Sequence, residues 1–134
     1  AQADCEILNA WLPAHANFTG CCSQKGITCE IKESRSCKHQ CINRSDFNSR
    51  KLTGQIPESI GSITNLNRLE IHSNYFVGSI PNSIKNLNLI NLYLNNNRLN
   101  GTIPDIGSVT SLIHLNLGNN QLSGTIPTSL ASII

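Results

Sequence analysis

The stretch LINLYLNNNRLNGTIP, residues 89–104, decides the fold of this chain. In this stretch Leu92 and Leu94 alternate with Asn91, Tyr93 and Asn95. An asparagine follows at Asn97, and the stretch ends in a Gly-x-Ile-Pro phrase. The 134-residue sequence holds four such phrases, which begin at Gly54, Gly78, Gly101 and Gly124. Their spacings of 24, 23 and 23 residues are typical of a solenoid, in which each repeat forms one coil and neighbouring coils share a core.

Three consecutive units match the pattern L-x-x-L-x-L-x-x-N-x-L, and each leads into one of the last three glycines. The unit before Gly54 is degenerate, because Ser45 and Arg50 stand at two of its inward positions. A terminal repeat is atypical in such proteins, since one of its faces meets a cap and not another coil. We therefore predict a cap over residues 1–41, followed over residues 42–134 by one capping coil, three regular coils and a terminal stub.

Each part of the repeat predicts a local structure. The Leu-x-Leu core has a period of two, which predicts a short strand with one buried face, parallel to the strand of the next coil. The repeated asparagines Asn74, Asn97 and Asn120 fall where the chain turns, and we expect their side chains to bond backbone groups there. A ladder of ligand-binding asparagines is the alternative that we disfavour. Apolar residues three apart after each proline predict a single helical or 3-10 turn on the convex side.

All the cysteines precede the regular repeats. They are Cys5, Cys21, Cys22, Cys29, Cys37 and Cys41. An even number in one segment is typical of a disulfide-stapled region in an oxidising compartment. The first four residues are neither apolar nor basic, so the simplest account is a mature secreted chain whose leader has been removed.

Three Asn-x-Ser/Thr sequons, at Asn17, Asn43 and Asn100, agree with a secreted chain and are candidates for glycosylation. Cys37 and Cys41, with a histidine between them, make an incomplete tetrahedral set for zinc, so we favour a disulfide there. We predict no metal and no cofactor.

The segment Leu89–Ile106 resembles the plant-type leucine-rich repeat, whose Gly-x-Ile-Pro element separates it from other classes of this repeat. The segment Cys21–Cys29 resembles the paired-cysteine cap that precedes such repeats in plant receptor kinases, receptor-like proteins and polygalacturonase-inhibiting proteins. The resemblance implies an α/β leucine-rich repeat solenoid with a parallel β-sheet on the concave face, short helical or 3-10 turns on the convex face, and a disulfide-stapled N-terminal cap. It also implies pairing of Cys5 with Cys21 and of Cys22 with Cys29, which leaves Cys37 with Cys41.

The same resemblance implies that ligands lie on the concave sheet. We call the outward strand positions the concave face, and they form three columns across the coils: Arg44, Arg68, Asn91 and His114; Asp46, Glu70, Tyr93 and Asn116; Asn48, His72, Asn95 and Gly118. The ligand-binding candidates are Arg68, Glu70, His72, Asn91, Tyr93, Asn95, His114 and Asn116. The alternative is a merely solvated sheet face, since strands with one buried side direct polar residues outward.

Size restricts what such a face can bind. Four strands at a spacing of ~4.8 Å make a sheet only ~15 Å wide, whereas a standard protein interface takes about 800 Å² from each partner. The ligand is therefore small, or partners also touch other surfaces, or the chain is part of something larger. No second cap follows the last repeat, which favours continuation in a longer ectodomain or self-association through the open end.

Composition disfavours several other classes of protein. The net charge is +2 without a basic block, which disfavours a nucleic-acid binder. No apolar run approaches the ~18 residues of a membrane span. The sequence holds no phosphate-cradling loop or nucleophile motif, so we predict that the chain is not an enzyme.

We predict a secreted or cell-surface recognition module that binds a protein, peptide or glycan without covalent chemistry. An inhibitor of a secreted hydrolase is the first alternative. A structural or ice-binding surface is less favoured, because the column after each repeat glycine is not an unbroken threonine ladder.

Overall fold

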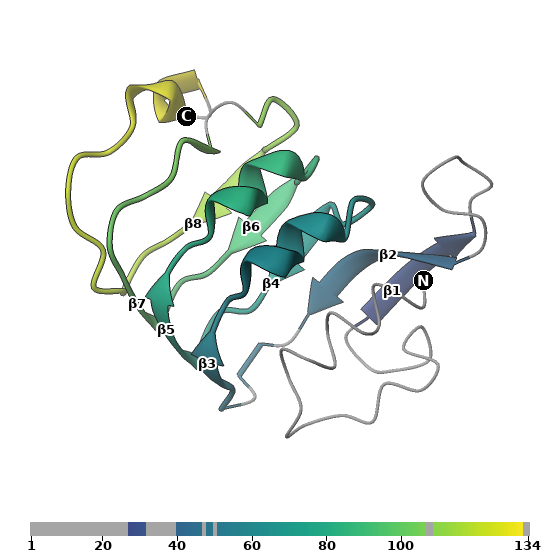
Figure 1. Ribbon diagram of the computed structural model, residues 1–134, viewed down its shortest axis with the longest axis horizontal. Coiled ribbons are helices and arrows are strands. Elements are labelled where there is room, and N and C mark those ends of the chain that lie inside the picture. The colour runs from purple at the N-terminus through teal and green to yellow at the C-terminus, as the bar shows by residue number, and fades with distance from the viewer. Residues whose placement is uncertain (1–26, 32–39, 47, 50, 107–108, 133–134) are drawn as a thin grey trace.

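The computed structural model describes residues 27–31, 40–46, 48–49, 51–106 and 109–132. Within these residues the chain winds in coils that pass in turn through one sheet, a second sheet and a turn of 3-10 helix (Figure 1). The side chains of all the cysteines, and those of Asn17 and Asn43, lie outside the described residues. The disulfide pairing and the glycosylation of Asn17 and Asn43 therefore stay predictions.

The larger sheet has five strands in the order β1-β2-β4-β6-β8. Their bounds are Ile27–Ile31 for β1, Gln40–Asp46 for β2, Arg68–Glu70 for β4, Asn91–Tyr93 for β6 and His114–Asn116 for β8. Strands β2, β4, β6 and β8 are parallel, as the repeat predicts. Strand β1 pairs antiparallel with β2, and the repeat pattern does not predict it. This strand joins the cysteine-rich segment to the first coil within one sheet.

A second, three-stranded sheet runs along another side of the coils, and we call it the lateral sheet (Figure 1). It contains β3 (Thr53–Gln55), β5 (Tyr75–Ser79) and β7 (Arg98–Asn100), all parallel. An isolated parallel bridge between Thr102 and Ser123 continues the same pairing toward the C-terminus. The repeat pattern does not predict this sheet.

Short 3-10 helices follow the prolines of the Gly-x-Ile-Pro phrases. They are η2 (Glu58–Ser62), η3 (Asn82–Asn86) and η5 (Thr128–Ser132). Pro57 and Pro81 lie directly before the first two, with extended backbone at ψ 151° and 139°. The fixed φ of proline suits this position, and its missing N–H is no loss before the first turn of a helix.

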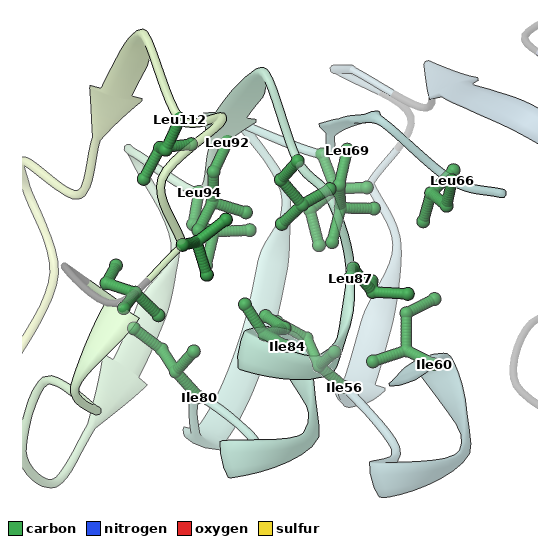
Figure 2. Close-up of a cluster of buried hydrophobic side chains, with 14 of the residues drawn as sticks. Ile56, Ile60, Leu66, Leu69, Ile80, Ile84, Leu87, Leu92, Leu94 and Leu112 are labelled. Atoms are coloured by element: carbon green, nitrogen blue, oxygen red, sulfur yellow. The ribbon is translucent and has the colours of Figure 1, made fainter. Parts of the chain in front are cut away.

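The core lies between the strands and the 3-10 helices (Figure 2). Leu69 and Leu92 reach it from the larger sheet, while Ile60 and Ile84 reach it from η2 and η3, and all of them are fully buried. Burying one such side chain stabilises the fold by about 1.5–3 kcal/mol. The stacked leucines and isoleucines are therefore the main force that holds successive coils together.

Burial decreases toward the C-terminal coil. Leu92 and Leu94 are fully buried, but Leu115 and Leu117, one repeat later, are only partly buried. Ile126 follows the last repeat glycine and is 71% exposed. Among the described residues, the last coil thus contacts a neighbouring coil on one side only.

The repeated asparagines bond the backbone, as predicted. Asn97 Nδ2 donates to the carbonyls of Leu94 at 3.0 Å and Ile71 at 3.1 Å, and its Oδ1 accepts from the N–H of Phe76 at 3.1 Å. Asn74 and Asn120 accept in the same way from the N–H groups of Leu52 and Leu99. Each asparagine therefore satisfies backbone groups within its own coil and in the coil before it, and those bonded by Asn74 and Asn97 are largely buried.

Candidate functional site

Three strands of the larger sheet position most of the candidate ligand-binding residues. Parallel pairing sets Arg68 beside Asn91 and Asn91 beside His114. The same registers set Glu70 beside Tyr93 and Tyr93 beside Asn116. The described strands β4, β6 and β8 therefore bring these candidates into the two columns that the repeat predicts.

Two candidates for the third column lie just after the strands. The N–H of Ser73 donates to the carbonyl of Asn95 at 2.9 Å, so the turn after β4 is bonded to the turn after β6. This bond keeps His72 and Asn95 at equivalent places in neighbouring coils. Both side chains are partly exposed.

The middle of the concave face is more closely packed than an ordinary solvated sheet. Glu70 is only 7% exposed and Asn91 only 9% exposed, although both occupy outward positions. Asn91 Nδ2 donates to Glu70 Oε1 at 3.5 Å. The rings of His72 and Tyr93 meet edge to face, with centroids 6.4 Å apart and planes inclined by 62°. We call Glu70, His72, Asn91 and Tyr93 the central cluster.

Three of the remaining candidates are more accessible than the central cluster. Arg68, His114 and Asn116 are exposed. Asn116 Oδ1 accepts a hydrogen bond from the N–H of Gly118 at 3.1 Å, which fixes the direction of its carboxamide. These side chains offer charge and hydrogen bonds to a molecule that lies over the sheet.

The outward side chains of this face carry charged, hydrogen-bonding and aromatic groups. Arg68 offers a guanidinium with five N–H donors, the asparagines offer both donors and acceptors, and Tyr93 offers a half-exposed ring. Within the part of the chain that the structure describes, no three histidine, cysteine, aspartate or glutamate side chains gather closely enough to hold a metal. None of the helices found there has the length and apolar character to cross a membrane.

The lateral sheet carries a second exposed group that the repeat pattern does not single out. Tyr75 is 42% exposed and Val77 is 39% exposed, and the guanidinium carbon of Arg98 lies 4.9 Å from the centroid of the Tyr75 ring. The alternation of Tyr75, buried Phe76 and Val77 was the available signal for a strand at this place.

The sequence model of the Leucine Rich Repeat family matches residues 65–87, 88–108 and 111–133, which together make half of the chain. The chain belongs to the leucine-rich repeat family. Each matched segment contains one strand of the larger sheet, β4, β6 or β8, so one repeat of the family corresponds to one coil of the structure. The predicted resemblance to plant-type leucine-rich repeat proteins is confirmed.

Curated relatives of this leucine-rich repeat chain come from Arabidopsis thaliana. Phytosulfokine receptor 1 is 31% identical over 90 residues, which cover 65% of this chain and 8% of that protein. Leucine-rich repeat extensin-like protein 2 is 34% identical over 77 residues, which cover 58% of this chain and 10% of that protein. The chain therefore spans a tenth or less of the length of these relatives.

Solved structures of plant receptors share the fold. The leucine-rich repeat ectodomain of the receptor kinase SOBIR1 from Arabidopsis thaliana is 28% identical with a TM-score of 0.88, over 99% of this chain and 75% of that one. The BIR3–SERK2 complex from the same plant is 28% identical with a TM-score of 0.80, and the match covers 99% of this chain and 76% of that one. The plant peptide hormone receptor RGFR1 in complex with RGF2 is 32% identical with a TM-score of 0.67, and the match covers 84% of this chain and 20% of that one.

Proposed function

We propose that this chain is an extracellular, non-catalytic recognition module that binds a peptide, or an extended segment of a protein, on its concave face. The observation that carries the proposal is the in-register array on β4, β6 and β8, where a packed central cluster lies beside exposed polar side chains. The similarity to the ectodomain of SOBIR1 and to a peptide hormone receptor supports this function and an extracellular location.

The central cluster suits ligand recognition because it is already ordered. The hydrogen bond between Asn91 and Glu70 and the edge-to-face contact between His72 and Tyr93 hold these side chains before any ligand arrives. Side chains that are ordered in the free protein lose less conformational entropy on binding. The half-exposed ring of Tyr93 is then available for apolar contact, and Tyr is enriched among the residues that dominate binding energies.

The dimensions of the sheet indicate the length of the ligand. Five strands at ~4.8 Å spacing give a width of about 19 Å, and an extended chain advances about 3.3 Å per residue. A peptide that crosses the strands therefore meets the sheet over about six residues. We expect a carboxylate in the peptide to lie near Arg68, and hydrogen-bonding groups to lie near His114 and Asn116.

The other hypotheses stay predictions. No feature of the described surface favours an inhibitor of a secreted hydrolase, an ice-binding surface or a glycan ligand over a peptide ligand. Self-association through the last coil also stays a prediction. We therefore take peptide recognition as the hypothesis to test first.

Selection from a random peptide library tests the proposal, because it does not require the natural ligand. Random heptapeptides displayed on phage are selected on the purified chain, and the affinities of synthetic copies are measured by calorimetry. We expect Tyr93→Ala to weaken binding of the selected peptides at least about tenfold, as for a central interface residue. The control is Tyr75→Ala, which removes the same side chain from the lateral sheet and leaves affinity unchanged.

Two results would contradict the proposal. One is a selection that yields no peptide above background. The other is a set of peptides whose affinity depends on Tyr75 and not on Tyr93.

A further inference from the structure

The sequon at Asn100 is presented on the lateral sheet. Asn100 is the last residue of β7, its side chain is exposed, and Thr102, the third residue of the sequon, is exposed as well. Among the described residues, no hydrogen bond joins the Asn100 carboxamide to another group. The repeated asparagines of the coil turns differ, because the Nδ2 of Asn97 donates to buried backbone carbonyls.

The neighbours of Asn100 include the exposed apolar part of the lateral sheet. Residues two apart on a strand share a face, so Asn100 lies on the same side as Arg98. The register sets Asn100 beside Ser79 and Arg98 beside Val77. Val77 is therefore a diagonal neighbour at about 8 Å, and Tyr75, under the Arg98 guanidinium, is the next outward residue along β5.

We propose that Asn100 carries an N-linked glycan that covers the surface formed by Tyr75, Val77 and Arg98. The covalent step is the transfer of an oligosaccharide from a polyprenyl diphosphate donor by an oligosaccharyltransferase of the secretory pathway. A bond forms between Nδ2 of Asn100 and the anomeric carbon of the first sugar. The bond between that carbon and the diphosphate oxygen breaks, and the amide nitrogen loses one proton.

The position of the glycan has a consequence for binding. A glycan is bulky and soluble, and its first sugars extend over the neighbouring outward side chains. The exposed ring of Tyr75 and the side chain of Val77 are then shielded from other proteins. The concave face lies on the other sheet and remains accessible, so the glycan directs partners to that face. This inference rests on the proposed extracellular location, and it does not depend on peptide binding.

Two variants at one position test the modification. Thr102→Ser keeps the sequon and Thr102→Ala destroys it, while both lose the same methyl group next to Gly124. The full chain is secreted from plant cells behind an added leader. Trypsin then releases residues 99–134 as a single peptide, since no lysine or arginine follows Arg98. We expect this peptide to carry a hexosamine-containing mass in the wild type and in Thr102→Ser, and to lack it in Thr102→Ala.

Hydroxyl-radical footprinting tests the shielding. Tyr75 lies in the tryptic peptide 69–85 and Tyr93 in the tryptic peptide 86–98, so each oxidation rate is measured separately. We expect the ratio of Tyr75 to Tyr93 oxidation to rise at least about twofold in Thr102→Ala relative to Thr102→Ser, because a bulky glycan no longer covers the lateral sheet. Tyr93 serves as the internal reference on the other sheet.

Two outcomes would overturn the inference. One is a secreted wild-type chain whose peptide 99–134 is unmodified. The other is a glycosylated chain whose oxidation ratio is the same in the two variants. Loss of peptide binding in the library experiment would leave both measurements unchanged, so a failure of the proposed function is distinguishable from a failure of this inference.

Discussion

At the scale of single residues, one asparagine in each coil replaces several hydrogen bonds that a strand or helix would otherwise supply. Asn97 donates to the carbonyls of Leu94 and Ile71 and accepts from the N–H of Phe76. Asn97 is itself buried, so these backbone groups have little access to water. This one carboxamide therefore contributes to the stability of its coil beside the packing of the apolar core.

We predict that Asn97→Ala lowers the free energy of unfolding by about 2–4 kcal/mol, because it leaves buried backbone groups without partners. Chemical denaturation of the purified variant measures the change. Asn88→Ala is the control, because Asn88 is exposed, and its expected change is within about 0.5 kcal/mol. Equal effects of the two substitutions would show that the asparagine bonds do not hold the coils.

The repeat predicts the positions of the residues on the concave face but not how deeply each of them is buried. The columns of the concave face follow from period two and from a fixed repeat length, so the sequence predicts them. The burial of Glu70 and Asn91 depends on how neighbouring outward side chains pack, and alternation alone predicts exposure. The repeat pattern does not predict the left-handed backbone at Ser73, Asn96 and Asn119. Asparagine is enriched in this conformation, so the sequence carries a weak signal at two of these positions, whereas serine carries little.

At the scale of elements, the 3-10 helices pack so closely that one position between them excludes a side chain. A Cβ atom added at Gly61, in η2, would lie 2.5 Å from Ser83 Cβ and 2.6 Å from the Ser83 carbonyl oxygen, in η3. The contact involves backbone, so a rotamer change of Ser83 does not relieve it. Gly61 is therefore needed for the close approach of the two helices.

We predict that Gly61→Ala destabilises the fold by about 1–3 kcal/mol, since η2 and η3 must separate to admit the methyl group. Thermal and chemical denaturation report the change. Ser59→Ala, at an exposed position of the same helix, is the matched control and is expected to be nearly neutral. If Gly61→Ala proved as stable as the control, the close packing of these helices would be refuted.

The main elements that the repeat pattern does not predict are the lateral sheet and strand β1. The strands of the lateral sheet are short, and in β7 a single leucine stands between Arg98 and Asn100. Three residues are too few for a periodic pattern to be distinguished from a loop. Strand β1 lies in the cysteine-rich segment, where cysteine spacing indicates disulfides and says little about strands.

At the scale of the whole molecule, stability is distributed along the solenoid axis. Each coil contributes its own packing and its contacts with neighbouring coils. Leu94 has a coil on each side and is fully buried, whereas Leu117, at the same place in the last coil, is only partly buried.

We predict that Leu94→Ala costs about 3 kcal/mol of stability and that Leu117→Ala costs about 1 kcal/mol, because a large cavity forms only where the side chain is enclosed. The two substitutions are chemically identical, so each serves as the control for the other in denaturation experiments. Equal costs would contradict the decrease in burial toward the C-terminal coil.

Recognition on the concave face is the central claim about the molecule, and amide chemical shifts test it most directly. A heptapeptide selected from the library is titrated into the isotope-labelled chain, and the shift change of every assigned amide is measured. We predict that the largest changes fall on β4, β6 and β8, at Arg68–Glu70, Asn91–Tyr93 and His114–Asn116. Changes concentrated on the lateral sheet at Tyr75–Ser79, with the concave face unperturbed, would contradict the claim.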